Sequence, residues 1–124
     1  PEDKMLIVLD LDNFKYINDT YGHQAGDQCL KVIAECLKKA YSRYGNCYRI
    51  GGDEFCVLFR EPKKEKYCRE KFYWIIEKRK KSLHMLPGAS YGSALIEEQE
   101  SISDTKARAD ANMYANKKAR KQAR

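Results

Sequence analysis

The chain has 124 residues, and its 24 Lys and Arg against 18 Asp and Glu give a formal net charge of +6. The last 19 residues hold seven basic side chains and one acidic one, so the excess is confined to the C-terminal end and excludes a uniformly basic nucleic-acid coat. The length predicts one domain, and no apolar run approaches the ~20 residues that span a bilayer.

The chain shows no leader peptide and does not begin with Met, so we expect a cytoplasmic fragment of a longer protein, whose parent can still be tethered to a membrane. Its five cysteines are odd in number and form no C-x-x-C pair. We therefore expect reduced thiols that serve mainly as small packing residues.

The first predicted element is residues 5–11, a nearly continuous apolar run that is typical of a strand buried on both faces. After a polar-aromatic stretch and two glycines, apolar residues recur at helical spacing and predict an amphipathic helix over residues 27–44, with Asp27 at its N-cap. Residues 47–50 and 55–59 are two short β-prone runs, and the Gly-Gly pair between them predicts a hairpin.

The second half of the chain continues with a predicted helix over residues 63–82, which follows Pro62. A further strand over residues 89–96 comes after a Pro-Gly turn, and Ser103 or Asp104 is expected to cap a last helix through the basic tail. The order is β-α-β-β-α-β with an added C-terminal helix, which predicts an α+β, ferredoxin-like fold. No repeat or linker divides the chain, so residues 1–124 are expected to form one domain.

Four carboxylates are expected to meet at one edge of this sheet. In a ferredoxin-like sheet the first strand lies antiparallel to the third, so the end of one meets the start of the other. These ends carry Asp10 and Asp12 on one side, Asp53 and Glu54 on the other. Carboxylates that converge repel one another unless a cation joins them, and such oxygens suit Mg²⁺. The alternative is that the four acids only cap strand ends in solvent.

Several motifs in register resemble the signatures of one family. Residues 10–19 read DLDNFKYIND, residues 51–55 read GGDEF, and residues 90–92 read SYG. Gly22-His23 and Gly26-Asp27 follow the first of these, and Ala109-Asp110, Met113-Tyr114 and Lys117 follow the last. Over residues 5–118 the chain is therefore similar to the GGDEF domain family, the diguanylate cyclases.

The resemblance implies an enzyme that condenses two GTP into cyclic di-GMP and releases two pyrophosphates. It implies a fold like the palm of nucleotidyl cyclases and polymerases, and a homodimer in which two bound GTP molecules face each other. By resemblance, Asp10, Asp53 and the backbone carbonyl of Leu11 bind Mg²⁺ or Mn²⁺. Glu54 is a further candidate for metal binding or acid–base catalysis.

The resemblance also assigns residues to the nucleotide. Asn18 and Asp27 match the positions that hold guanine, whose N1–H and N2–H₂ donors a carboxylate can accept. Lys15, Lys117 and Lys121 match phosphate-facing positions, Lys15 as part of the catalytic set. Phe14, Gly51 and Gly52 are expected to approach the nucleotide closely. The alternatives are an N-cap for Asp27, a turn residue for Asn18 and a solvated lysine for Lys15.

The chain departs from the family at three places. Arg120 stands where a Gly is usual and can continue the last helix. Lys121 takes the place of the usual arginine. We expect Arg120 and Arg124 to lie at a solvated end of this helix. Ser42 and Gly45 stand where many relatives have an Arg-x-x-Asp site for product inhibition, so we expect none there. The usual N-terminal helix and its Asp-x-Leu-Thr segment are absent from these residues.

Two functions other than a cyclase are open. The first is a catalytically inactive domain that senses GTP or cyclic di-GMP. The second is a ferredoxin-like RNA-binding module, but the predicted strands lack the exposed aromatics and the basic face that this requires. The expected partner of the C-terminal basic charge is therefore a nucleotide rather than a nucleic acid.

Overall fold

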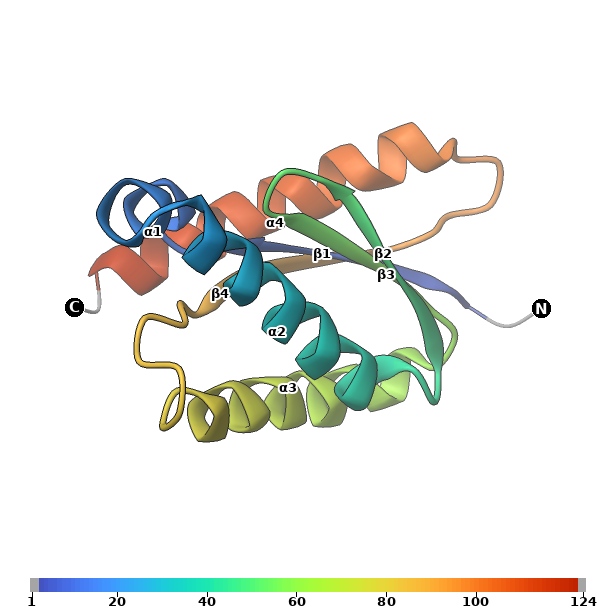
Figure 1. Cartoon of the computed structure of the whole chain (residues 1–124). Coiled ribbons are helices and arrows are strands. Elements are labelled where there is room, and N and C mark those ends of the chain that lie inside the picture. The colour runs from blue at the N-terminus through green and yellow to red at the C-terminus, as the bar shows by residue number, and fades with distance from the viewer. Residues whose placement is uncertain (1–2, 123–124) are drawn as a thin grey trace.

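Residues 3–122, which the computed structural model describes, build a four-stranded antiparallel sheet between two layers of helices (Figure 1). The strands are β1 (Met5–Leu11), β2 (Gly45–Gly51), β3 (Glu54–Phe59) and β4 (Ala89–Leu95), in the spatial order β2-β3-β1-β4. This is the strand order of a split-βαβ sheet, and it confirms the predicted α+β fold. The predicted pairing of the first and third strands is also confirmed, with Asp10 opposite Glu54.

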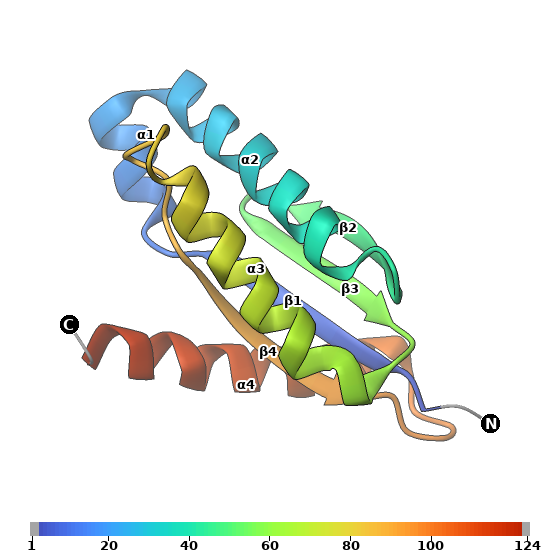
Figure 2. The same cartoon turned by 90° about the horizontal axis from the view of Figure 1, so that it is seen from below.

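The helices are α1 (Phe14–Tyr21), α2 (His23–Tyr41), α3 (Glu65–Arg79) and α4 (Ile102–Gln122), and the short 3₁₀ helix η1 (Pro62–Lys64) leads into α3. Figure 2 shows α2 and α3 side by side over one face of the sheet, while α4 crosses the other face. None of the helices within residues 3–122 is both long and apolar enough to cross a membrane.

Side chains of β1 alternate between two hydrophobic cores. Ile7 and Leu9 are fully buried in the larger core under α2 and α3, while Val8 belongs to a smaller core with Ala109 and Met113 of α4. A strand buried on both faces reads as a continuous apolar run, which explains the pattern of residues 5–11. All five cysteines are free, and three of them are buried, as expected for packing residues.

The helix boundaries differ from the predictions: α2 ends at Tyr41 instead of residue 44, and α3 covers Glu65–Arg79 instead of residues 63–82. Residues 14–21 form a helix of their own, α1, and α2 already begins at His23, so Asp27 lies within α2 and is not its N-cap. Gly26 allows α1 to approach α2 closely at this point. It is buried in α2, and any Cβ on it would overlap the Asn18 Oδ1 of α1.

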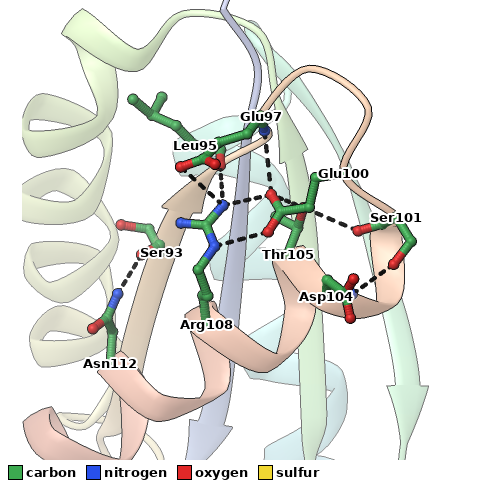
Figure 3. A network of polar contacts seen from close by, with 9 residues as sticks. All are labelled: Ser93, Leu95, Glu97, Glu100, Ser101, Asp104, Thr105, Arg108 and Asn112. Atoms are coloured by element: carbon green, nitrogen blue, oxygen red, sulfur yellow. Dashed lines mark hydrogen bonds and ion pairs between the residues drawn. The ribbon is translucent and has the colours of Figure 1, made fainter.

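The last helix is capped one turn earlier than predicted. Neither Ser103 nor Asp104 is the cap; the Ser101 hydroxyl accepts a hydrogen bond of 3.0 Å from the Asp104 amide (Figure 3). The Arg108 guanidinium donates to Glu100 and to the Leu95 carbonyl, each at 2.6 Å. These bonds tie the N-terminal half of α4 to the end of β4, so that α4 is a firm support for the basic residues farther along it.

Candidate functional site

The turn between β2 and β3 sets the position of the first carboxylates. Gly52 has a left-handed φ of 38°, which favours glycine, and the register of β2 shifts between Arg49 and Gly51. Arg49 Nε and Nη2 donate to the Gly52 carbonyl at 2.9 and 2.6 Å. The Leu11 amide donates to the Asp53 carbonyl at 3.3 Å, which joins the turn to the end of β1. Asp53 is thereby held beside Asp10.

The two carboxylates of Asp10 and Asp53 form an electrostatically strained pair. Burial, together with the neighbouring Asp10 carboxylate, raises the pKa of Asp53 to about 6. Asp10 Oδ2 accepts a hydrogen bond of 2.8 Å from Lys117 Nζ, whereas Asp10 Oδ1 is buried and has no hydrogen-bond partner among residues 3–122. Burial alone would lower the pKa of Lys117, but the three aspartates around it outweigh burial and the pKa is raised. Lys117 is therefore held in its charged form.

Asp12 and Glu54 are drawn to other partners, so the expected convergence of four carboxylates is found for two. The chain turns after Leu11, where the Asp12 amide donates to the Gly88 carbonyl at 2.9 Å. This turn directs Asp12 to Ser90 Oγ, which donates to its Oδ1 at 2.6 Å. Glu54 faces α4 and lies 3.4 Å from Lys106 Nζ.

Within residues 3–122, no group of three or more carboxylate, His or Cys side chains is arranged to hold a metal ion. The pair of Asp10 and Asp53 nevertheless fits a hard divalent cation. Mg²⁺ is commonly bound by one or two carboxylates, with waters and substrate phosphates as its remaining ligands. A cation here would relieve the repulsion between the two carboxylates, which adds to burial in raising the pKa of Asp53, and would satisfy the buried Asp10 Oδ1.

Arg120 is not part of a solvated helix end, contrary to the prediction. Its Nε and Nη2 donate to Asp12 Oδ2 at 3.1 and 2.9 Å, and its guanidinium lies 5.3 Å from the centre of the Tyr73 ring. Helix α4 does continue past Arg120, as its sequence predicted, and carries the exposed Lys121 in its last turn. Lys121 and Lys117 line a narrow crevice beside Asp12, while Arg124 lies outside the described residues.

Asp27 lies in an open cleft of about 390 Å³ between α2 and the hairpin, lined also by Leu30, Lys31, Ala34, Arg49 and Phe55. A cavity of this size suits a small-molecule ligand. Asn18 contacts α2 at Gly26, the residue that precedes Asp27. The cleft also adjoins the carboxylate edge through Phe55, which follows Glu54 in β3. The structure therefore brings Asn18 close to the turn of α2 that carries Asp27.

The two remaining residues of the first motif lie in the first turn of α1. Phe14 is half-buried and packs against the larger core. Lys15 is exposed, and its Nζ lies 2.8 Å from Asp19. The hydrogen bond to Asp19, and then the negative charge of Asp19, raise the pKa of Lys15.

Sequence reasoning gave no role to Lys106 or Ser90. Lys106 Nζ bridges Glu54 to Asp110, at 3.4 and 2.8 Å. The spacing of Lys106 and Asp110 by four residues was a visible signal for their contact within α4. Ser90 was visible only as part of a motif, and its bond to Asp12 depends on the fold.

Comparisons with known proteins identify the family and the fold of the chain. The family model described as "Diguanylate cyclase, GGDEF domain" matches residues 1–123. The probable diguanylate cyclase DgcJ of Escherichia coli K12 is 34% identical over an alignment of 119 residues that covers 91% of this chain and 23% of that protein. The chain thus spans about a quarter of that relative.

Solved structures of the family are similar over 95% of this chain, among them the following two. The GGDEF domain of DgcB from Caulobacter crescentus, solved in complex with c-di-GMP, is 32% identical with a TM-score of 0.83, and 74% of it is covered. The active GGEEF domain of a diguanylate cyclase from Vibrio cholerae is 25% identical with a TM-score of 0.78, and 78% of it is covered.

Proposed function

Because the chain belongs to the GGDEF domain family of diguanylate cyclases, we propose that it condenses two GTP into cyclic di-GMP and two pyrophosphates. The observation that carries the proposal is the pair of Asp10 and Asp53 at the sheet edge, with Lys117 of α4 bonded to Asp10. Paired carboxylates with an adjacent fixed cation are suited to a reaction on phosphate.

Guanine would occupy the cleft that Asp27 lines. The Asp27 carboxylate can accept hydrogen bonds from the guanine N1–H and N2–H₂ groups. The Asn18 side chain lies against Gly26, the residue that precedes Asp27 in α2. Adenine lacks these donors, so Asp27 would be left unpaired and ATP should be rejected. Phe55 lines the cleft and follows Glu54 in β3, so a base in the cleft would have its phosphates directed toward Asp10 and Asp53.

The charged residues at the edge then divide the chemistry of phosphoryl transfer. Lys117, with Lys15 and Lys121, would bind the triphosphate, and the backbones of Phe14, Gly51 and Gly52 would lie close to it. The 3′ oxygen of one GTP forms a bond to the α-phosphorus of the other, and the bond to the pyrophosphate oxygen breaks. The proton of the 3′-hydroxyl leaves to a carboxylate at this edge, Asp53 or Glu54.

Mg²⁺ or Mn²⁺, bound by Asp10, Asp53, Glu54 and the Leu11 carbonyl, would neutralise charge on the α-phosphate and the departing pyrophosphate. Each copy of the domain holds one GTP, so two copies must face each other for the reaction to occur. We therefore expect turnover to require a homodimer, and the rate to rise more steeply than in proportion to protein concentration.

Incubation with GTP and Mg²⁺, followed by chromatography of the nucleotides, tests the proposal. Cyclic di-GMP should form with the unchanged chain and be lost in Asp53→Asn, which keeps the side-chain shape but removes the charge. Glu98→Gln, an exposed residue away from the edge, is the matched control and should retain activity. Absence of product from the unchanged chain, even when two copies are joined covalently, would refute the cyclase.

A second candidate is a domain that binds GTP or cyclic di-GMP without turnover. It is favoured by Arg120, which is fixed on Asp12 and prolongs α4 where relatives are expected to turn. Under this alternative, GTP should bind to the joined copies in isothermal titration, while no cyclic di-GMP forms.

Product inhibition at the usual Arg-x-x-Asp position is not expected. Gly45 stands at the place of the carboxylate, and a Cβ there would lie 2.7 Å from the Leu58 carbonyl oxygen. No acidic side chain can therefore be accommodated at this position in β2. Isothermal titration with cyclic di-GMP should therefore show no tight binding at this position. Tight binding to the unchanged chain that is lost in Ser42→Asp would contradict the prediction.

A further inference from the structure

A single stripe of lysine and aromatic side chains follows the outer face of α3. It consists of Lys63, Tyr67, Lys71, Trp74, Lys78 and Lys81, and we call it the α3 stripe. Tyr67, Lys71, Trp74 and Lys78 follow one another at spacings of three and four residues, which places their side chains on one side of the α3 axis. Lys63, in η1, precedes α3, and Lys81 lies in the turn that follows it. Cys68, Phe72, Ile75 and Ile76 occupy the opposite, buried side.

The aromatic residues of the α3 stripe are unusually open to solvent. Tyr67 is 64% exposed and Trp74 is 59% exposed. They border a shallow, open depression whose other lining residues are Lys63, Lys66, Glu70 and Lys71. Lys78 Nζ lies 4.3 Å from the centre of the Trp74 ring, so even this aromatic face carries a cation.

The charge of the α3 stripe is one-sided. Its four lysines have one acidic neighbour in the depression, Glu70. The other acidic residues of α3 are engaged elsewhere, because Glu65 lies 3.1 Å from Arg69 and Glu77 lies 3.2 Å from Lys80. The face therefore presents positive charge together with two amphipathic aromatic rings.

We propose that the α3 stripe docks on a bilayer surface that contains anionic phospholipid. Trp and Tyr are the side chains that settle at the headgroup level of a membrane, and lysines can bury their stems while the ammonium groups meet lipid phosphates. An anionic leaflet attracts lysines near its surface, and the loss of each one weakens binding by about fivefold. Charge complementarity thus selects the lipid surface as the occupant.

Docking through the α3 stripe leaves the carboxylate edge of the sheet accessible. Helix α3 covers one face of the sheet, whereas Lys106 and Lys117, which contact the site, belong to α4 on the other face (Figure 2). A molecule that lies on a membrane through α3 would therefore present the carboxylate edge to the solution. This proposal does not depend on the proposed cyclase activity.

The cations of the stripe argue against RNA as its occupant. All four are lysines, whereas recognition of nucleic-acid phosphates and bases favours the planar fork of arginine. The two aromatic residues lie seven positions apart on a helix with Lys71 between them, so they offer no platform on which successive bases could stack. RNA binding is nevertheless an outcome that the experiment can detect.

The single tryptophan of the chain makes the test specific to this face, because Trp74 is the only source of tryptophan fluorescence. The full chain is mixed with vesicles of phosphatidylcholine that contain about one-third phosphatidylserine, and with phosphatidylcholine vesicles alone. We expect the Trp74 emission to shift to the blue and to be quenched by brominated lipid, only with the anionic vesicles and at low salt.

Two charge-reversal variants complete the test. Lys71→Glu/Lys78→Glu should weaken co-sedimentation with anionic vesicles by at least about 25-fold. Lys38→Glu/Lys39→Glu has the same change in net charge on exposed positions of α2, and should weaken it far less.

Three results would overturn the proposal. The first is no shift of Trp74 emission with anionic vesicles. The second is co-sedimentation without that shift, because binding would then use another face, such as the basic end of α4. The third is a shift that RNA produces and vesicles do not.

Discussion

Gly92→Ala should push α4 away from the sheet and destabilise the fold. Gly92 is buried in β4 opposite Val8, at the point where α4 crosses. A Cβ on this residue would lie 2.7 Å from the Met113 Cα, and closer still to the Ala109 oxygen and the Met113 nitrogen. These are backbone atoms of α4, so no side chain can rotate out of the way. The helix itself must retreat, by about 1 Å, to restore ordinary contact.

The cost can be worked from these contacts. Overpacking a core costs about 1–3 kcal/mol, and the upper end applies because the obstacle is backbone. Replacing Gly by Ala gains at most about 1 kcal/mol from the reduced freedom of the unfolded chain. We therefore expect the free energy of unfolding to fall by about 2 kcal/mol. The same retreat would draw Lys117 away from Asp10, where the bond is now 2.8 Å.

Equilibrium unfolding in urea measures this loss. With an m-value of about 1.5 kcal/mol per M, the midpoint should fall by about 1.3 M. Ser93→Ala is the matched control, because it changes the next residue of β4, whose side chain points to the opposite sheet face; its effect should stay within about 0.5 kcal/mol. If the midpoint of Gly92→Ala equals that of the unchanged chain, the close packing of α4 on β4 is refuted.

Three further substitutions test separate features. In the absence of metal, Asp53→Asn should raise the thermal midpoint of unfolding above pH 6. The pKa of Asp53 in the folded chain is raised to about 6, so ionisation of Asp53 lowers the stability as the pH rises through 6. The gain in the variant should be about 1 kcal/mol, after allowance for partial exposure, and should vanish near pH 4. Arg120→Ala should cost about 2 kcal/mol, because it leaves the buried Asp12 carboxylate without its cation. Tyr41→Phe should be neutral or stabilise by up to about 1 kcal/mol, because the buried Tyr41 hydroxyl has no hydrogen-bond partner within residues 3–122.

Each of these predictions has a result that would contradict it. A constant difference between Asp53→Asn and the unchanged chain from pH 4 to pH 8 would show that Asp53 does not titrate as described. For Arg120, the double variant with Asp12→Asn should recover much of the lost stability, and simple additivity would argue against the ion pair. For Tyr41, urea unfolding that shows a loss above about 1 kcal/mol would reveal an unseen partner of the hydroxyl.

The sequence predicted the strands well, since their signal is local. Burial of β1 on both faces gives its unbroken apolar run, and the glycines before Asp53 mark the hairpin. Helix α1 was missed even though Phe14, Ile17 and Tyr21 repeat at helical spacing. It has only eight residues, and so short an amphipathic stretch cannot be told from a loop by periodicity.

The site was predictable in its residues but not in its pairings. The strand order alone was enough to expect Asp10 near Asp53. That Asp12 turns away to Arg120, 108 residues later, depends on the Asp12–Gly88 hydrogen bond and on the path of α4. Neither has a local signal in the sequence. The prediction that Arg120 is solvated was wrong for the same reason, because its contact with Asp12 is long-range.

The register shift in β2 has a consequence for aggregation of the protein in concentrated solution. Strand β2 lies at an open edge of the sheet, and most of its residues are exposed. An open edge invites a foreign strand to pair with it, which is a common route to aggregation. The irregularity between Arg49 and Gly51, with the Arg49 fork closed on the Gly52 carbonyl, interrupts this template beside the carboxylates. The end of the sheet at which we propose that a nucleotide binds is thus also the end where pairing with a foreign strand is interrupted.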